Sequence, residues 1–93
     1  MDTTVIIVSY KSDHLIEKNI AIFDKETKII IIDNSQNKNL KKNIENNHEN
    51  VTVILNLNKG FGQAANLGAK LAKTKYIFFV VRIIILRKMR YMV

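Results

Sequence analysis

Residues 58–68 are the part of the sequence best suited to bind a phosphate group. Gly60 and Gly62 precede a predicted helix, whose first turn offers free backbone N–H groups and the positive end of the helix dipole. The spacing Gly60-x-Gly62-x-x-Ala65 also matches a dinucleotide-binding fingerprint. That interpretation fails because the segment follows the third apolar run instead of the first, and no acidic residue follows it to hold a ribose. Two alternatives remain: a phosphate-binding loop, or a turn that the glycines only shape.

Asp33 and Asn34 form a second group of candidate binding residues, at the end of another apolar run. A carboxylate in this position can accept hydrogen bonds from a ribose hydroxyl or from a base N–H. The alternative is an Asx turn, with Ser35 or Asn37 capping the next helix. Taken alone, these residues favour the turn.

Ser9 and Tyr10 end the first apolar run and form a third group. The Tyr10 ring could stack on a nucleobase. The alternative is a strand-terminal aromatic side chain that packs on a helix, and the two residues taken alone favour that alternative.

Hydrolytic and metal chemistry find little support in the sequence. Cysteine is absent, which removes disulfides, thiolate metal ligands and cysteine nucleophiles. His14 and His48 have no partner at metal-ligand spacing, and we expect both to be solvated. No Ser-His-Asp set and no pair of carboxylates can be assembled.

Four short apolar runs predict the strands that carry these groups. They are rich in β-branched and aromatic residues and mostly continuous, which is typical of strands buried on both faces of a parallel sheet. Helical patterns fill the gaps, so the predicted order is β-α-β-α-β-α-β in one small domain. The carboxyl ends of parallel strands lie at one edge of a sheet, where ligands bind. The runs are residues 5–8, 29–32, 51–55 and 76–81.

The predicted helices are recognised by their apolar faces. Ser12 is the expected N-cap of the first helix, with Asp13 in its first turn. The second helix is the weakest, in a stretch rich in asparagine and lysine. The third has small residues that permit close approach to a sheet. The expected faces are Ile16, Ile20 and Phe23, then Leu40 and Ile44, then Ala64, Leu67, Gly68, Leu71 and Ala72.

The net charge of +7 is unevenly distributed. Residues 1–81 contain eleven lysines and eight acids, a net charge of +3, and the last twelve residues add +4. No arginine precedes Arg82, and no arginines alternate with stacking aromatics, so we expect no nucleic-acid partner. No signal peptide is recognisable, and the predicted compartment is the cytoplasm.

Taken together, the three groups closely resemble the family 2 glycosyltransferases. Within that family they are most similar to the bacterial rhamnosyltransferase-like members of cell-surface polysaccharide synthesis. The resemblance covers residues 3–79 in order and spacing. The matching segments are Thr4-Val5-Ile6-Ile7-Val8-Ser9-Tyr10-x-Ser12, Ile30-Ile31-Ile32-Asp33-Asn34-Ser35 and Asn58-x-Gly60-Phe61-Gly62-x-Ala64-x-Asn66-x-Gly68.

This resemblance implies the N-terminal half of a GT-A fold, a Rossmann-like α/β/α sandwich with four mostly parallel strands. It implies a nucleotide-diphosphate sugar donor of UDP or dTDP type, and a glycan or lipid-linked acceptor. Ser9 and Tyr10 would line the nucleoside pocket, Asp33 would hold the base or ribose, and residues 58–66 would lie near the diphosphate. The full set of expected donor-binding residues is Ser9, Tyr10, Asp33, Asn34, Asn58, Gly60, Phe61 and Asn66.

The chain departs from the family pattern in two places. Lys11 stands where the family usually has asparagine. After residue 79 the family continues with a short acidic segment that holds a divalent metal, Mg²⁺ or Mn²⁺, at the leaving diphosphate. No acid follows Glu49 here, and Arg82 stands where a metal ligand is expected. We therefore expect no metal site and no transferase activity from this chain.

The sequence divides into a nucleotide-sugar-binding part, residues 1–81, and a basic, apolar tail, residues 82–93. The tail could attach to an anionic membrane surface, add an element to the sheet, or be an out-of-frame translation that replaced the natural continuation; its abrupt change in composition favours the last. Two other functions remain open: a nucleotide-binding module or pseudoenzyme, and a membrane-surface protein that acts through the tail.

Overall fold

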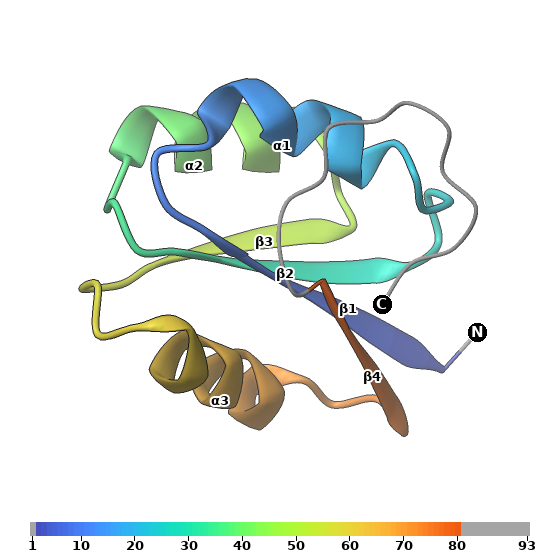
Figure 1. Cartoon of the computed structure of the whole chain (residues 1–93). Helices are drawn as coiled ribbons and strands as arrows, with labels where there is room; N and C mark the ends of the chain where they lie inside the picture. The colour runs from blue at the N-terminus through green and yellow to red at the C-terminus, as the bar shows by residue number, and fades with distance from the viewer. Residues whose placement is uncertain (1, 81–93) are drawn as a thin grey trace.

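The computed structural model describes residues 2–80, which form one parallel sheet with helices on both faces (Figure 1). The predicted alternation of strands and helices is confirmed. The elements are β1 (Thr3–Ser9), α1 (Asp13–Ile20), β2 (Lys28–Asp33), α2 (Lys38–Asn47), β3 (Val51–Leu55), α3 (Phe61–Leu71) and β4 (Tyr76–Val80). Residue 81 and the predicted tail, with Arg82, lie outside the described residues.

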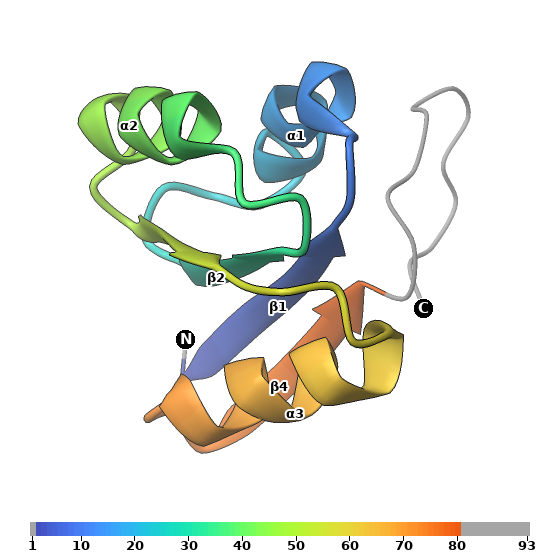
Figure 2. The same cartoon turned by 90° about the vertical axis from the view of Figure 1, so that its left-hand side faces the viewer.

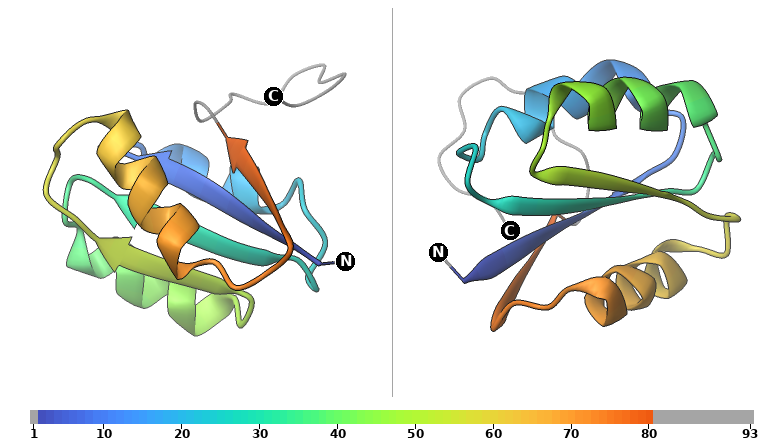
Figure 3. Two further views of the ribbon diagram at one scale, coloured as in Figure 1. Left: turned by 90° about the horizontal axis from the view of Figure 1, so that it is seen from below. Right: turned by 180° about the vertical axis from the view of Figure 1, so that it is seen from behind.

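The sheet has the strand order β3-β2-β1-β4, and every neighbouring pair is parallel. Helices α1 and α2 cover one face, and α3 covers the other (Figures 2 and 3). The chain therefore builds outward from β1 through β2 to β3, then crosses to the opposite side of β1 for β4. Such a reversal of strand order leaves a crevice at the carboxyl ends of the strands. This arrangement confirms the predicted Rossmann-like α/β/α sandwich.

The main core lies between the sheet and the pair α1 and α2. Alternate β-branched residues of each strand point into it, as expected of strands covered on both faces. Ile16, Ile20, Leu40 and Ile44 close the core from the helices, which confirms the predicted helix faces at these positions. Its buried members are Val5, Ile7, Ile16, Ile20, Ile29, Ile31, Leu40, Ile44, Val51, Val53 and Val80.

The start of α1 is as predicted in position, with Ser12 at the N-cap and Asp13 in the first turn, but Phe23 is not on the helix. The helix ends at Ile20, so Phe23 reaches the core from the following turn and packs edge-to-face on Phe78, with ring centroids 6.1 Å apart. Ser12 occupies the N-cap position, but its hydroxyl donates to the Tyr10 carbonyl oxygen at 3.0 Å and does not cap the helix.

Helix α3 approaches the sheet closely because small residues face β1 and β2. Ala64 and Gly68 are buried, and a Cβ atom at Gly68 would lie 2.6 Å from Ile6 Cγ2 and 3.6 Å from Ile32 Cγ1. Leu71 of the predicted stripe is exposed instead. The contact between α3 and the sheet is therefore centred on two small residues, and Leu71 lies at its margin.

A charged pair joins α2 to β3. The Lys41 ammonium donates to Glu45 Oε2 at 2.8 Å and to the Val53 carbonyl oxygen at 2.6 Å, while the Val53 N–H donates to Glu45 Oε2 at 2.8 Å. The hydrogen bond from Lys41 and then that from Val53 lower the pKa of Glu45 below its usual value of 4.5.

Because the pKa of Glu45 is lowered on folding, its ionised form stabilises the protein above pH 4.5, and this contribution is lost as the pH falls through the folded-state pKa. We expect Glu45→Gln to reduce the free energy of unfolding by about 1 kcal/mol at pH 7, with a smaller difference from wild type at pH 3. Urea unfolding at both pH values measures this. Glu49→Gln, on an exposed residue, is the control. A difference that is the same at both pH values would contradict the assignment.

Candidate functional site

The ends of β1 and β2 are joined at the carboxyl edge of the sheet. Ser9 and Asp33 are register partners, and the Ser9 hydroxyl donates to Asp33 Oδ1 at 3.1 Å. The Asn34 N–H donates to the Ser9 carbonyl oxygen at 2.8 Å. The structure thus places the second and third groups of candidate residues side by side.

Asp33 is fully buried, and its carboxylate is directed at its own loop. Besides Ser9, the Ser35 hydroxyl and N–H donate to Oδ1 at 2.6 and 3.2 Å, and the Asn37 N–H donates to Oδ2 at 2.8 Å. Asn37 also caps α2, accepting from the Leu40 N–H at 3.0 Å. The Asx-turn alternative therefore describes the observed geometry, and a contact between Asp33 and a ribose or base stays a prediction.

A chain of side-chain amides continues from β2 to the start of α3. Asn56 Nδ2 donates to Asn34 Oδ1 and to Gln63 Oε1, each at 2.8 Å. Asn34 Nδ2 lies 3.5 Å from Asn58 Oδ1, which also accepts from the Gly60 N–H at 3.2 Å. The first group of candidate residues is thereby tied to the second. Neither Asn56 nor Gln63 is among the predicted donor-binding residues: Asn56 precedes the motif, and Gln63 occupies one of its unspecified positions.

The start of α3 is open to a ligand. Gly60 is its N-cap, with φ +89°, a left-handed conformation that other residues adopt at a cost, and no side chain caps the helix. Phe61 is 42 % exposed, and Asn66 is exposed on the same helix. The first-turn N–H groups can therefore receive an anion.

Tyr10 projects from the end of β1. Its side chain is 49 % exposed, and the Lys11 ammonium lies 5.3 Å from the centroid of its ring. An exposed aromatic face beside a cation is suited to stack on a nucleobase and to attract a phosphate.

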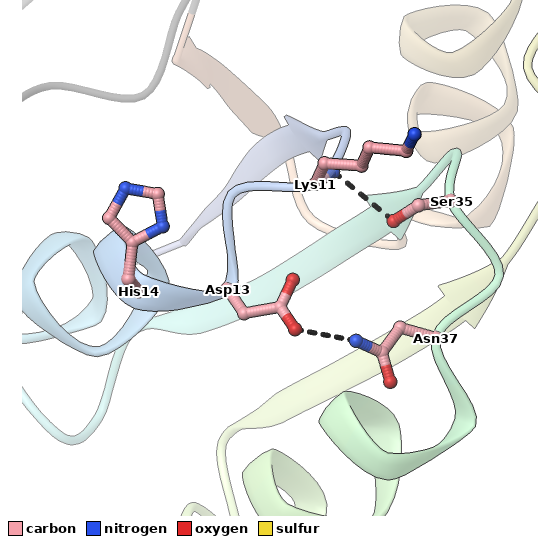
Figure 4. Close-up of a pocket in the computed structure, with 5 residues that line it drawn as sticks. All are labelled: Lys11, Asp13, His14, Ser35 and Asn37. Atoms are coloured by element: carbon pink, nitrogen blue, oxygen red, sulfur yellow. Dashed lines mark hydrogen bonds between the residues drawn. The ribbon is translucent and has the colours of Figure 1, made fainter.

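A pocket of about 560 Å³, open to solvent, lies near this edge between the β1–α1 and β2–α2 loops (Figure 4). None of the eight predicted residues lines it. Its residues come from these two loops and from the first turn of α1. The two sides are joined by hydrogen bonds: the Lys11 N–H donates to Ser35 Oγ at 3.2 Å, and the Asn37 amide donates to Asp13 Oδ2. The lining residues are Lys11, Asp13, His14, Ser35 and Asn37.

The two histidines differ in their surroundings. His14 is exposed, as expected, but the solvated state expected for His48 is wrong, because its Nε2 lies 2.8 Å from Glu17 Oε1. Across residues 2–80, no three or more His, Cys, Asp or Glu side chains gather closely enough to hold a metal ion. The described residues therefore do not fit the divalent metal that the resemblance implies.

Lys11 and Gln36, in the paired loops, have φ values of 52° and 55°. A left-handed backbone is costly for both, and asparagine tolerates it better. We expect Lys11→Asn to raise the free energy of unfolding by about 0.5 kcal/mol, which thermal unfolding would report as a higher Tm. Lys11→Gln removes the same charge without relieving the backbone and should leave the Tm unchanged. If the two substitutions raised the Tm equally, the increase would come from the loss of charge and not from the backbone.

A parallel α/β sheet, with polar loops meeting at its carboxyl edge beside a helix that no side chain caps, is the arrangement typical of Rossmann-like nucleotide-binding domains. Comparison with protein families identifies it further. The model of glycosyl transferase family 2 matches residues 4–80, and the chain belongs to this family. No curated protein and no solved structure matched the chain.

Family membership confirms the resemblance seen in the sequence at the level of the family and supports a glycosyltransferase-like function. A nucleotide-sugar donor is what the family implies in general, and its type stays a prediction. The rhamnosyltransferase-like subtype and the cytoplasmic location stay predictions. No helix within residues 2–80 has the length and apolar character needed to cross a membrane.

Proposed function

We propose that the carboxyl edge of this domain binds the nucleotide diphosphate of a sugar donor, of UDP or dTDP type, in a hexosyltransferase-type family member. One observation supports this most directly. The three motif segments are linked by hydrogen bonds at the same edge, through Ser9 to Asp33 and through Asn34 to Asn58 and Gly60.

Different residues of the chain bind different parts of the nucleotide. The exposed Tyr10 ring stacks on the base, and the Lys11 ammonium beside it lies close enough to attract the negative ligand. The uncapped first turn of α3, beginning at Gly60, donates N–H groups to the diphosphate. Asp33 contributes by holding the loops in place, since its oxygens already accept four hydrogen bonds.

In this proposal the described residues bind the sugar donor but do not catalyse the cleavage of its bond to the diphosphate. Transfer of a sugar breaks its bond to the diphosphate and forms one to an acceptor hydroxyl, glycan or lipid-linked, whose proton must be removed. The bound metal of the family would neutralise the leaving diphosphate. Because no carboxylate follows Glu49, we propose that the 93-residue chain does not turn over a donor. Release of UDP or dTDP from sugar donors by the purified chain, with Mg²⁺ or Mn²⁺ present, would contradict this.

Binding is tested by calorimetric titration of UDP and dTDP. We expect saturable binding of one of them, and Tyr10→Ala should weaken it about ten-fold because base stacking is lost. Tyr76→Ala is a matched control: Tyr76 is 58 % exposed and has Lys75 5.5 Å from its ring centroid, but it begins β4, at the opposite edge of the sheet. A flat titration of the wild-type chain with both nucleotides would refute the proposed function.

A further inference from the structure

Asn56 connects three parts of the candidate site although it lies outside the family motif. Its backbone N–H donates to the Asp33 carbonyl oxygen at 3.0 Å. Its side-chain amide donates both to Asn34 at the end of β2 and to Gln63 in the first turn of α3. One side chain thus joins the loop that follows β2 to the helix start proposed to receive the diphosphate.

The direction of the amide chain is fixed from one end. The Gly60 N–H can only donate, so the oxygen of Asn58 faces it. Asn34 then presents its amino group to Asn58 and its oxygen to Asn56. Position 56 must therefore supply two donors, one for each of two carbonyl oxygens. The primary amide of asparagine does so, and alanine supplies none.

The position of α3 on the sheet has a separate cause. Gly68 packs the helix against Ile6 and Ile32, more than one helical turn beyond Gln63. Loss of the Asn56 amide would therefore leave the helix in place on the sheet and free only its first turn. That turn contains the backbone groups nearest to Gly60.

We propose that Asn56 is a positioning residue for the donor diphosphate, acting through Gln63 and Asn34 by holding the first turn of α3 against the end of β2. This inference rests on the proposed function. It implies that Asn56 contributes more to the affinity for a nucleoside diphosphate than to the affinity for the corresponding monophosphate, because in this proposal the outer phosphate is the one nearest to the helix.

The test compares the Kd of UDP with that of UMP, or of dTDP with that of dTMP if the wild type prefers thymidine, at a temperature where each variant is folded. For Asn56→Ala we expect the diphosphate Kd to rise about ten-fold, with a change of less than about three-fold for the monophosphate. Asn46→Ala, on the exposed part of α2, should change neither. A purely structural role would lower the Tm and leave the ratio of the two Kd values unchanged.

Gln63→Ala removes the acceptor of the hydrogen bond that Asn56 donates to α3. Because alanine is a strong helix former, this variant remains informative if Asn56→Ala fails to fold. We expect it to change the ratio as Asn56→Ala does, and the double variant to lose no more than either single one. An unchanged ratio in the folded single variants, or additive losses in the double variant, would overturn the inference. Failure of the wild type to bind any of these nucleotides would overturn the proposed function and the inference with it.

Discussion

Replacing Asp33 with alanine should lower the free energy of unfolding by about 3 kcal/mol and abolish saturable nucleotide binding. The carboxylate is fully buried and accepts hydrogen bonds from Ser9, Ser35 and Asn37. Its removal leaves several donors without a partner and releases both loops that form the carboxyl edge. Urea unfolding at pH 7 measures the stability, and calorimetry with UDP and dTDP measures the binding.

Asp24 offers a matched control for this substitution. Its Oδ1 also accepts from a following N–H, that of Glu26, and from the Thr27 hydroxyl, but the turn is exposed and precedes β2. Asp24→Ala should cost less than about 1 kcal/mol and leave nucleotide binding intact. If Asp33→Ala were no more destabilising than Asp24→Ala, Asp33 would not have the organising role that we assign to it.

The second large effect is expected at Gly68, where valine should reduce the free energy of unfolding by about 3 kcal/mol. A Cβ atom there would already lie 2.6 Å from Ile6 Cγ2, which is attached directly to a β-branched carbon and cannot swing away freely. The helix must therefore move off the sheet, and the packing that positions α3 is weakened. Urea unfolding of the purified variant measures the loss.

Gly62→Ala separates this steric effect from the general influence of glycine on a helix. A Cβ atom at Gly62 meets no atom within 4 Å, so alanine should raise the free energy of unfolding by about 0.5–1 kcal/mol through helix propensity alone. Destabilisation by Gly62→Ala, or a neutral Gly68→Val, would show that close packing at Gly68 is not the controlling contact.

The strands and their alternation with helices along the chain could be predicted from the sequence because both are encoded locally, and the family could be predicted from three motif segments in the expected order. Continuous β-branched runs such as residues 29–32 indicate a strand covered on both faces, and the structure confirms a parallel sheet. The small residues Ala64 and Gly68 indicated close packing of the third helix, which is also confirmed. These signals need no knowledge of distant contacts.

The surroundings of Asp33 depend on contacts that a local pattern does not contain. Ser9 and Asp33 are 24 residues apart, and only the register of β1 on β2 brings the hydroxyl to the carboxylate. The same offset pairs Lys11 with Ser35 and so creates the pocket that sequence reasoning missed. The available signal was weak: Ser35 was identified as a possible cap and as part of a matching segment, and Lys11 as a departure from the family, and neither was among the predicted donor-binding residues.

The pair formed by Lys41 and Glu45 has a consequence beyond the attachment of α2. Val53 lies on β3, the outermost strand on its side of the sheet, and both of its backbone hydrogen-bonding groups are occupied by these two side chains. An incoming strand finds neither a free donor nor a free acceptor at that residue, so this margin resists edge-to-edge association. Addition of a strand beside β3 therefore first requires the Lys41 and Glu45 side chains to withdraw from Val53.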